Sequence, residues 1–313
     1  MNDPTVLSSF GRSMLQGLAR PRKGLEPKFF YDDRGSELFE QITELEAYYP
    51  TRTELGILED CAPAIAREIG PGAVVAEPGA GALKKAGILL RALERPAAFA
   101  PGDISVDHLK AAAADLQAEF PDLPIRPFAV DFDRPFDLPA ETASLGPVSV
   151  FFPGSTIGNF EPPAARDLLA RFAGIGDART LVLGADLQKD PDILVRAYDD
   201  PEGVTAAFNM NILARANREL GADFDLDAFR HVARYDADLG RIEMHLESLK
   251  DQSVTVLGRR VDFAAGETIH TENSYKYSVA GMQDLAREAG WTPTEVWTDS
   301  GRLFSVHLFR RDD

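Results

Sequence analysis

A run of small and β-branched apolar residues, ending in an acid and a glycine turn, constrains this chain more than any other stretch. Residues 73–81 read A-V-V-A-E-P-G-A-G, and the helix-like segment Leu83–Leu93 follows. The pattern predicts a buried strand, a tight turn at Gly79 and Gly81, and the start of a helix. In such an arrangement the backbone at the glycines can approach a nucleotide-sized ligand closely.

The same stretch departs from the dinucleotide fingerprint G-x-G-x-x-G. The third position is Lys84 instead of glycine, so close packing against a pyrophosphate is not indicated. Glu77, at the predicted strand end, suits a ligand that carries hydroxyl or amine donors. We therefore expect an adenosyl-type cofactor at this turn.

Composition narrows the classes of partner. The chain has 313 residues and a formal net charge of −17, which opposes binding to nucleic acid or to an anionic membrane. Cys61 is the only cysteine, which excludes an intrachain disulfide and a thiolate metal cage. The five histidines lack a ligand spacing such as H-x-x-x-H on a helix, so we expect no metal. Without a long apolar N-terminal segment, we expect a cytoplasmic protein.

Helical periodicity dominates the first 70 residues. Apolar residues recur at helical spacing, and capping residues stand where helices should begin. The predicted helices span residues 4–20, Glu37–Leu45 after a cap at Ser36, and a third from a capping box at Thr51 and Glu54 to Ile69.

From residue 73 the chain alternates strand and helix, which is typical of a parallel sheet covered by helices on both faces. Three acids, Glu77, Asp103 and Asp131, follow strand ends and share one predicted rim, where ligands bind in such sheets. Strands are predicted at 73–77, 98–103, 125–130, 148–152 and 180–184, with helices at 83–94, 105–120 and 163–172.

After Asp186 the pattern changes to helices followed by period-2 runs, which predict a small antiparallel sheet. The chain then returns to the first pattern near residue 277, so we expect two domains, 54–189 plus 277–313 and 1–53 plus 190–276, with a ligand cleft between them. The predicted helices are 192–198, 204–220, 226–232 and 279–289, and the predicted strands 241–249, 253–260, 267–271, 294–298 and 303–309.

Several long stretches are particular to one known family and occur in its order. They are K-F-F-Y-D-D-R-G-S-E-L-F-E-Q-I-T at 28–43, Y-Y-P-T-R-T-E at 48–54, F-P-G-S-T-I-G-N-F at 152–160, L-V-R-A-Y-D-D-P-E-G-V-T-A-A-F-N at 194–209, E-L-G-A-D-F-D-L-D-A-F at 219–229, R-I-E-M at 241–244 and H-T-E-N-S at 270–274. On these stretches the sequence resembles the S-adenosylmethionine-dependent histidine Nα-methyltransferases of ergothioneine biosynthesis.

The resemblance implies a Rossmann-like class I methyltransferase sheet of seven strands, the last antiparallel, in the first of these domains. The second domain would be an α+β substrate domain. It also implies S-adenosyl-L-methionine as cofactor and three successive methylations of the α-amine of histidine, which give its betaine, hercynine. The implied cofactor-binding residues are Glu77, Gly79, Gly81, Lys85, Asp103, Asp131 and Phe132.

The resemblance implies a substrate site as well, and the residue types suit a free amino acid. Asn159 and the tyrosines can hold the carboxylate and amine, Glu272 and Ser274 the imidazole, and aromatic faces the final trimethylammonium cation. Tyr31 and Asn159 are the predicted catalytic residues. The sequence requires no strong base, since the amine can lose its proton to water, and Tyr31 is our candidate for a proton shuttle. The implied substrate-binding residues are Tyr48, Asn159, Tyr198, Phe208, Met244, Glu272 and Ser274.

Two departures from the family pattern keep alternatives open. Pro78 and Ala80 stand in the glycine loop, where the family has an apolar residue and a hydroxyl, and Asn273 and Tyr275 flank Ser274. One alternative is an Nα-methyltransferase that acts on another amino acid or on a biogenic amine. Another is a non-catalytic cofactor-binding protein. We expect a monomer in each case.

Overall fold

The computed structural model describes residues 7–81, 83–104 and 106–311. The chain divides into two compact units, each made of two segments. The first unit comprises Met1–Tyr49 and Lys189–Ser274, and the second comprises Pro50–Gln188 and Tyr275–Asp313. Which unit serves the cofactor and which the substrate stays a prediction.

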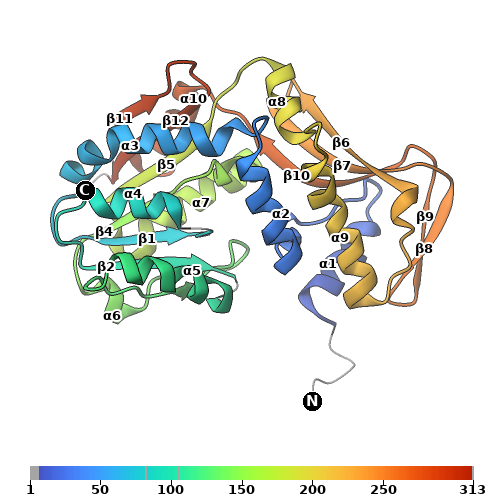
Figure 1. Ribbon diagram of the computed structural model, residues 1–313, viewed down its shortest axis with the longest axis horizontal. Helices are drawn as coiled ribbons and strands as arrows, with labels where there is room; N and C mark the ends of the chain where they lie inside the picture. Colours follow the sequence, from blue (N-terminus) through green and yellow to red (C-terminus); the bar gives the residue numbers. More distant parts are fainter. Residues whose placement is uncertain (1–6, 82, 105, 312–313) are drawn as a thin grey trace. The chain divides into compact units, whose positions relative to one another are not determined.

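The second unit is built on a seven-stranded sheet in the order β11-β12-β5-β4-β1-β2-β3 (Figure 1). Neighbouring strands from β5 to β3 run parallel, whereas β12 is antiparallel to both β5 and β11. This order confirms the predicted Rossmann-like sheet with an antiparallel last strand. Its strands are β1 Val74–Pro78, β2 Ala98–Asp103, β3 Phe128–Ala129, β4 Val148–Phe152, β5 Thr180–Asp186, β11 Trp291–Thr298 and β12 Phe304–Arg311.

Helices cover both faces of this sheet, because the central strands are apolar on both sides. Helices α3, α4 and α5 pack on one face, and α7 and α10 on the other. Trp291 and Phe172 are fully buried in the hydrophobic core between the sheet and the helices α7 and α10. The helical segments of the unit are α3 Tyr49–Ile69, α4 Lys84–Ala92, α5 Val106–Glu119, α6 Ala140–Ala143, η2 Thr156–Asn159, α7 Pro162–Gly174, η3 Ile175–Asp177 and α10 Val279–Glu288.

The first unit contains a three-stranded sheet in the order β10-β7-β6 and a separate hairpin of β8 and β9. Helices α8 and α9 pack against β6 and β7, and α2 packs along α9. Its elements are α1 Ser9–Leu18, η1 Pro27–Phe30, α2 Asp33–Glu44, α8 Pro191–Tyr198, α9 Val204–Leu220, η4 Leu226–Ala228, β6 Phe229–Asp236, β7 Arg241–Ser248, β8 Gln252–Val256, β9 Arg259–Phe263 and β10 Thr268–Tyr275.

Two predicted helix starts are wrong. The cap of α2 is Asp32, whose Oδ1 accepts the Gly35 N–H at 2.8 Å, and Ser36 lies inside the helix. Helix α3 begins at Tyr49, so Thr51 is helical and forms no capping box. In both helices the predicted cap residue lies within one turn of the true start. The local sequence alone does not show at which of these positions the helix begins.

Two predictions in the later part of the first unit are also wrong. The predicted helix at 226–232 is the short turn η4 followed by strand β6, which pairs along its whole length with β7. The single strand predicted at 253–260 is a hairpin, whose turn residues Leu257 and Gly258 both have positive φ, 51° and 74°. In both segments, pairing with a neighbouring strand determines the secondary structure. Hydrophobic periodicity over seven or eight residues does not reveal such pairing.

Other boundaries shift by a few residues. Strand β3 is shorter than predicted, although Ile125 still forms an isolated bridge to Phe99. The predicted cap at Ser105 lies outside the described residues. Among the described residues, every helix is too short or too polar to span a lipid bilayer.

Candidate functional site

The glycine turn after β1 has the conformation that the sequence pattern predicts. Gly79 has φ +75°, and the N–H groups of Gly79 and Ala80 both donate to the Gly102 carbonyl, at 2.7 and 2.8 Å. A Cβ at Gly79 would lie 2.9 Å from the Phe132 ring, whereas a Cβ at Gly81 would meet no atom of the described residues within 4 Å. The turn therefore requires glycine at 79 for conformation and packing, and it leaves space at 81.

Glu77 ends β1 inside the protein. Its side chain is buried, and among the described residues Oε2 has no hydrogen-bond partner. Burial raises the pKa of Glu77 to about 8, while Lys85 acts to lower that pKa and Glu54 to raise it. A buried carboxyl with an unsatisfied oxygen favours a ligand that brings hydrogen-bond donors or positive charge, so Glu77 fits an adenosyl cofactor with an amino-acid tail.

Lys85 is held by Glu54, the acid of the predicted capping box. Glu54 Oε2 lies 2.5 Å from Lys85 Nζ, and both oxygens of Glu54 accept the Gly154 N–H at 2.9 Å. A Cβ at Gly184 would lie 2.0 Å from Glu54 Oε1, so the carboxylate packs directly on β5. Glu54 was missed as a site residue because its partners are distant in sequence, and no local pattern links them.

The acids after β2 and β3 stand at neighbouring strand ends, as predicted. Asp103 ends β2 and pairs in register with Ala129 of β3, and Asp131 follows β3. Asp131 Oδ1 accepts the Asp133 N–H at 3.0 Å, and Oδ2 lies 3.5 Å from Arg134 Nε. Asp131 therefore also shapes its own turn, as strand-end acids commonly do.

Phe132 completes this edge of the sheet. Besides its contact with the Gly79 turn, its ring lies edge-on to three other phenylalanines at centroid distances of 5.6 to 5.9 Å. Edge-to-face packing of this kind fixes the ring. The three neighbours are Phe136, Phe152 and Phe160.

Asn159 ends the short helix η2, which follows β4. Ser155 opens η2 with φ 56°, and its Oγ accepts the Asp186 N–H at 2.9 Å. A Cβ at Gly158 would lie 2.7 Å from the Tyr275 carbonyl oxygen, so the backbones pack closely beside Asn159. The Tyr275 hydroxyl donates to Glu161. The loop that carries Asn159 is thus fixed on both sides, and Asn159 itself is half-buried.

In the first unit, the predicted site residues Tyr31, Tyr48, Tyr198 and Phe208 gather with Phe39 in an aromatic cluster. Ring centroids lie 5.7 Å apart for Tyr31 and Phe208, and 6.1 Å apart for Tyr48 and Tyr198. Phe39 contacts three members, at 5.6 to 6.5 Å. Phe39 was not predicted as a site residue, although it lies in the stretch 28–43 that resembles the family.

A hydroxyl pair lies beside this cluster. Tyr198 Oη and Ser274 Oγ are 2.8 Å apart and buried. His231 supports the pair, with Nε2 lying 2.7 Å from the Tyr198 carbonyl oxygen and Nδ1 lying 2.8 Å from Asn209 Nδ2. Burial lowers the pKa of His231. An amide donor to Nδ1 and a carbonyl acceptor at Nε2 select the neutral tautomer protonated on Nε2.

Met244 and Glu272 stand on neighbouring strands of the same unit. Met244, on β7, is buried, and its carbonyl accepts the Thr271 hydroxyl at 2.9 Å. Glu272 is half-buried on β10, two residues before Ser274. Ring contacts and a hydrogen bond therefore bring Tyr31, Tyr48, Tyr198, Phe208 and Ser274 together. Met244 and Glu272 lie on the adjoining sheet.

Comparison with known proteins gives a match along nearly the whole chain. Residues 10–311 match the family described as "Histidine-specific methyltransferase, SAM-dependent". A protein of Mycolicibacterium smegmatis named histidine N-alpha-methyltransferase is 43% identical over 303 residues, which cover 95% of this chain and 93% of that protein. A protein of the same name from Mycobacterium tuberculosis is 42% identical over 305 residues, with the same coverage.

More distant matches include a longer protein and a solved structure. Ergothioneine biosynthesis protein 1 of Neurospora crassa is 29% identical over 311 residues, 96% of this chain and 35% of that protein. A structure titled as a "possible exported protein" of Bordetella parapertussis is 13% identical, with a TM-score of 0.52 over 100% of this chain and 90% of that one. The structural likeness shows the fold alone.

Proposed function

We propose that this protein, which belongs to the S-adenosylmethionine-dependent, histidine-specific methyltransferase family, trimethylates the α-amino group of free L-histidine. The product would be the betaine hercynine, in a step of ergothioneine biosynthesis. The observation that carries the proposal is the match over residues 10–311, together with 43% identity to a histidine N-alpha-methyltransferase. The aromatic cluster and the hydroxyl pair of the first unit support it, because they suit a small zwitterion that becomes a permanent cation.

The cofactor residues that we propose lie in the second unit. S-Adenosylmethionine, when bound, supplies a methyl group activated by the sulfonium charge. Glu77 would bind a donor group of the cofactor through its unsatisfied oxygen, and the open side of Gly81 would admit the cofactor to the backbone. Asp103 would accept from ribose hydroxyls. The full proposed set is Glu77, Gly79, Gly81, Lys85, Asp103, Asp131 and Phe132.

For the substrate, we propose that Glu272 accepts from an imidazole N–H and that Tyr48 donates to the carboxylate. Tyr198 and Ser274 form one hydroxyl pair. We propose that both hydroxyls bind the same polar group of the substrate. Phe208, which is buried, offers a ring face, and attraction of a trimethylammonium group to such faces contributes about 0.5–2 kcal/mol. Met244 would set the space beside the imidazole.

The amine must be neutral to attack the methyl group, so each cycle begins with loss of a proton. Tyr31 is 43% exposed, and its hydroxyl can pass that proton to water. Asn159 can donate to the substrate carboxylate and accept from the amine, which leaves the nitrogen lone pair directed at the methyl group.

Incubation with S-adenosylmethionine and histidine, followed by mass spectrometry, tests the function. We expect histidine to gain three methyl groups, with one S-adenosylhomocysteine formed per methyl. An acceptor panel of histidine, tryptophan, tyrosine and biogenic amines separates the alternatives. Preference for another acceptor would favour the related N-methyltransferase, and cofactor binding without turnover of any acceptor would favour a non-catalytic protein.

Glu272→Ala tests the substrate assignment. We expect the KM for histidine to rise on the order of tenfold or more, because a charge-assisted hydrogen bond to the imidazole is lost. Cofactor affinity, measured by calorimetry, should stay unchanged. Asp262→Asn is the matched control, since Asp262 is an exposed acid on β9 of the same unit. Equal losses of histidine and cofactor binding would contradict the assignment.

Glu54→Gln tests the support of Lys85. The amide keeps an acceptor for the Gly154 N–H but loses the charge that anchors Lys85 Nζ. We expect the Kd for the cofactor to rise on the order of tenfold. Glu68→Gln, at an acid on the same helix that pairs with Arg310 at the surface, should leave it within about threefold. If both variants bind the cofactor as tightly as wild type, Glu54 does not position Lys85.

Two further expectations belong to the same proposal. We expect the protein to be a cytoplasmic monomer. Light scattering coupled to gel filtration should give a mass near 34.2 kDa, and a mass of twice this value would refute the monomer.

A further inference from the structure

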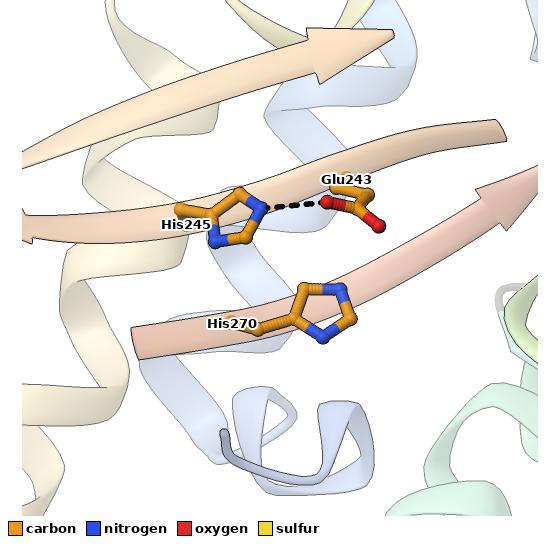
Figure 2. Close-up of side chains that lie close together, drawn as sticks. All are labelled: Glu243, His245 and His270. Carbon is orange, nitrogen blue, oxygen red and sulfur yellow. Dashed lines mark hydrogen bonds and ion pairs between the residues drawn. The ribbon is translucent and has the colours of Figure 1, made fainter. Parts of the chain in front are cut away.

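Three potential metal ligands lie together on the sheet of the first unit. Glu243, His245 and His270 each offer one ligand atom, and these atoms all lie within 4.8 Å of one another. Figure 2 shows the three side chains side by side, two from β7 and one from the adjacent strand β10. None of them belongs to the substrate or cofactor residues proposed above.

Strand geometry explains the cluster. Glu243 and His245 are two residues apart, so both point to the same face of β7. His270 comes from β10, which neighbours β7 in the sheet. The imidazoles of His245 and His270 have centroids 5.0 Å apart and planes only 32° apart. Rings in this arrangement can direct nitrogens at one common point.

Hydrogen bonds already engage the proposed ligands. His270 Nε2 lies 3.1 Å from the Glu272 carbonyl oxygen, so an ion would have to replace that bond or bind Nδ1. Glu243 Oε2 lies 3.0 Å from His245 Nε2. Glu243 Oε1 accepts hydrogen bonds from both Nε and Nη2 of Arg241, at 2.9 and 2.5 Å. An ion could thus replace the proton between Oε2 and Nε2 while Arg241 continues to orient the carboxylate. A ligating carboxylate that is itself hydrogen-bonded is usual at metal sites.

The surroundings of the cluster shift the pKa of each of its three groups. Burial lowers the pKa of His245 and of His270. Burial acts to raise the pKa of Glu243, but hydrogen bonds from Arg241 and His245 outweigh it and lower that pKa overall. In addition, His245 Nδ1 is buried and has no hydrogen-bond partner among the described residues.

We propose that Glu243, His245 and His270 bind one divalent transition-metal ion. Two imidazole nitrogens with one carboxylate oxygen suit zinc, cobalt, nickel or iron(II), whereas calcium and magnesium prefer all-oxygen sites. The bound ion would link β7 to β10, and β10 also carries Glu272 and Ser274. The positive charge of Arg241 beside Glu243 opposes the cation, so the affinity should be moderate.

Equilibrium dialysis of the untagged protein against zinc and cobalt chloride tests the proposal. We expect one ion per chain, and a Kd raised on the order of 100-fold in His245→Ala and in His270→Ala. Glu247→Gln is the matched control, because Glu247 lies on the same face of β7 and pairs with Arg230 and Arg234 outside the cluster. Its Kd should change less than about threefold.

Thermal unfolding gives a second, independent readout. Zinc should raise the Tm of the wild-type protein and of Glu247→Gln, because a ligand bound only to the folded state stabilises it. It should leave the Tm of His270→Ala unchanged, and circular dichroism without metal checks that this variant is folded. Binding that is weak, not one-to-one, or equal in all variants would mean that the cluster is a hydrogen-bonded group and not a metal site.

Discussion

Lys276→Met is expected to lower the free energy of unfolding by about 3–5 kcal/mol. Lys276 Nζ lies 2.8 Å from Asp186 Oδ2, and the two side chains are 0% and 1% exposed. Methionine keeps most of the volume of lysine but removes its charge, so Asp186 would remain as a buried carboxylate without its counter-ion. The position adds to the cost, since the Asp186 carbonyl accepts the Tyr277 N–H and Asp186 pairs with Phe304 on β12.

Urea unfolding measures this loss, and two further variants interpret it. Replacing both partners, in Asp186→Asn with Lys276→Met, should cost less than Lys276→Met alone, because no charge is then left buried. Arg287→Met removes an exposed ion pair with Asp284 on α10, and its cost should stay within about 1 kcal/mol. A Lys276→Met variant as stable as the Arg287→Met variant would contradict the importance of this pair.

Glu77 is expected to make the stability of the cofactor-free protein fall as pH rises. Its pKa is about 8 in the folded protein, against an ordinary value of 4.5. Between these values the folded state keeps the proton and the unfolded state has lost it, so the folded state binds more protons. The stability of wild type relative to Glu77→Gln should therefore decrease by up to about 1.4 kcal/mol per pH unit across this window.

Urea unfolding of wild type and Glu77→Gln at pH 5, 6 and 7 measures this slope. Lys85 and Glu54, the charged groups that act on Glu77, are present in both proteins. If the cofactor brings positive charge to Glu77, as we propose, then its binding should release a proton near neutral pH, which calorimetry in two buffers detects. Parallel stability profiles for the two proteins would show that Glu77 is already ionised in the folded state.

Much of the second unit follows from local sequence. Buried strands such as Val148–Phe152 are continuous apolar runs, and each is followed by a helix with a regular apolar face, so the parallel sheet can be predicted without any long-range information. The first unit was predicted less well. Strand β6 carries arginine, histidine and tyrosine, and only its pairing with β7 makes it a strand.

The candidate site divides in the same way. Gly79 and Glu77 stand in one short motif, and the motif itself predicts their closeness. Glu54, Phe39 and His270 also lie in stretches that resemble the family, but those stretches do not show which side chains they contact. A signal did exist in E-x-H at 243–245, because period-2 spacing on a strand places two ligands on one face as surely as H-x-x-x-H does on a helix. Its third member lies 25 residues further along.

By itself, the sequence determined the alternation of strands and helices, the glycine turn and the family, because each of these depends on residues that are adjacent in the chain. Tertiary structure alone decided that Glu54 holds Lys85, that Lys276 pairs with Asp186 inside the protein, and that Tyr198 meets Ser274. These pairs join residues 31 to 90 positions apart. Their energies depend on burial and distance, and both quantities exist only once the sheets have formed.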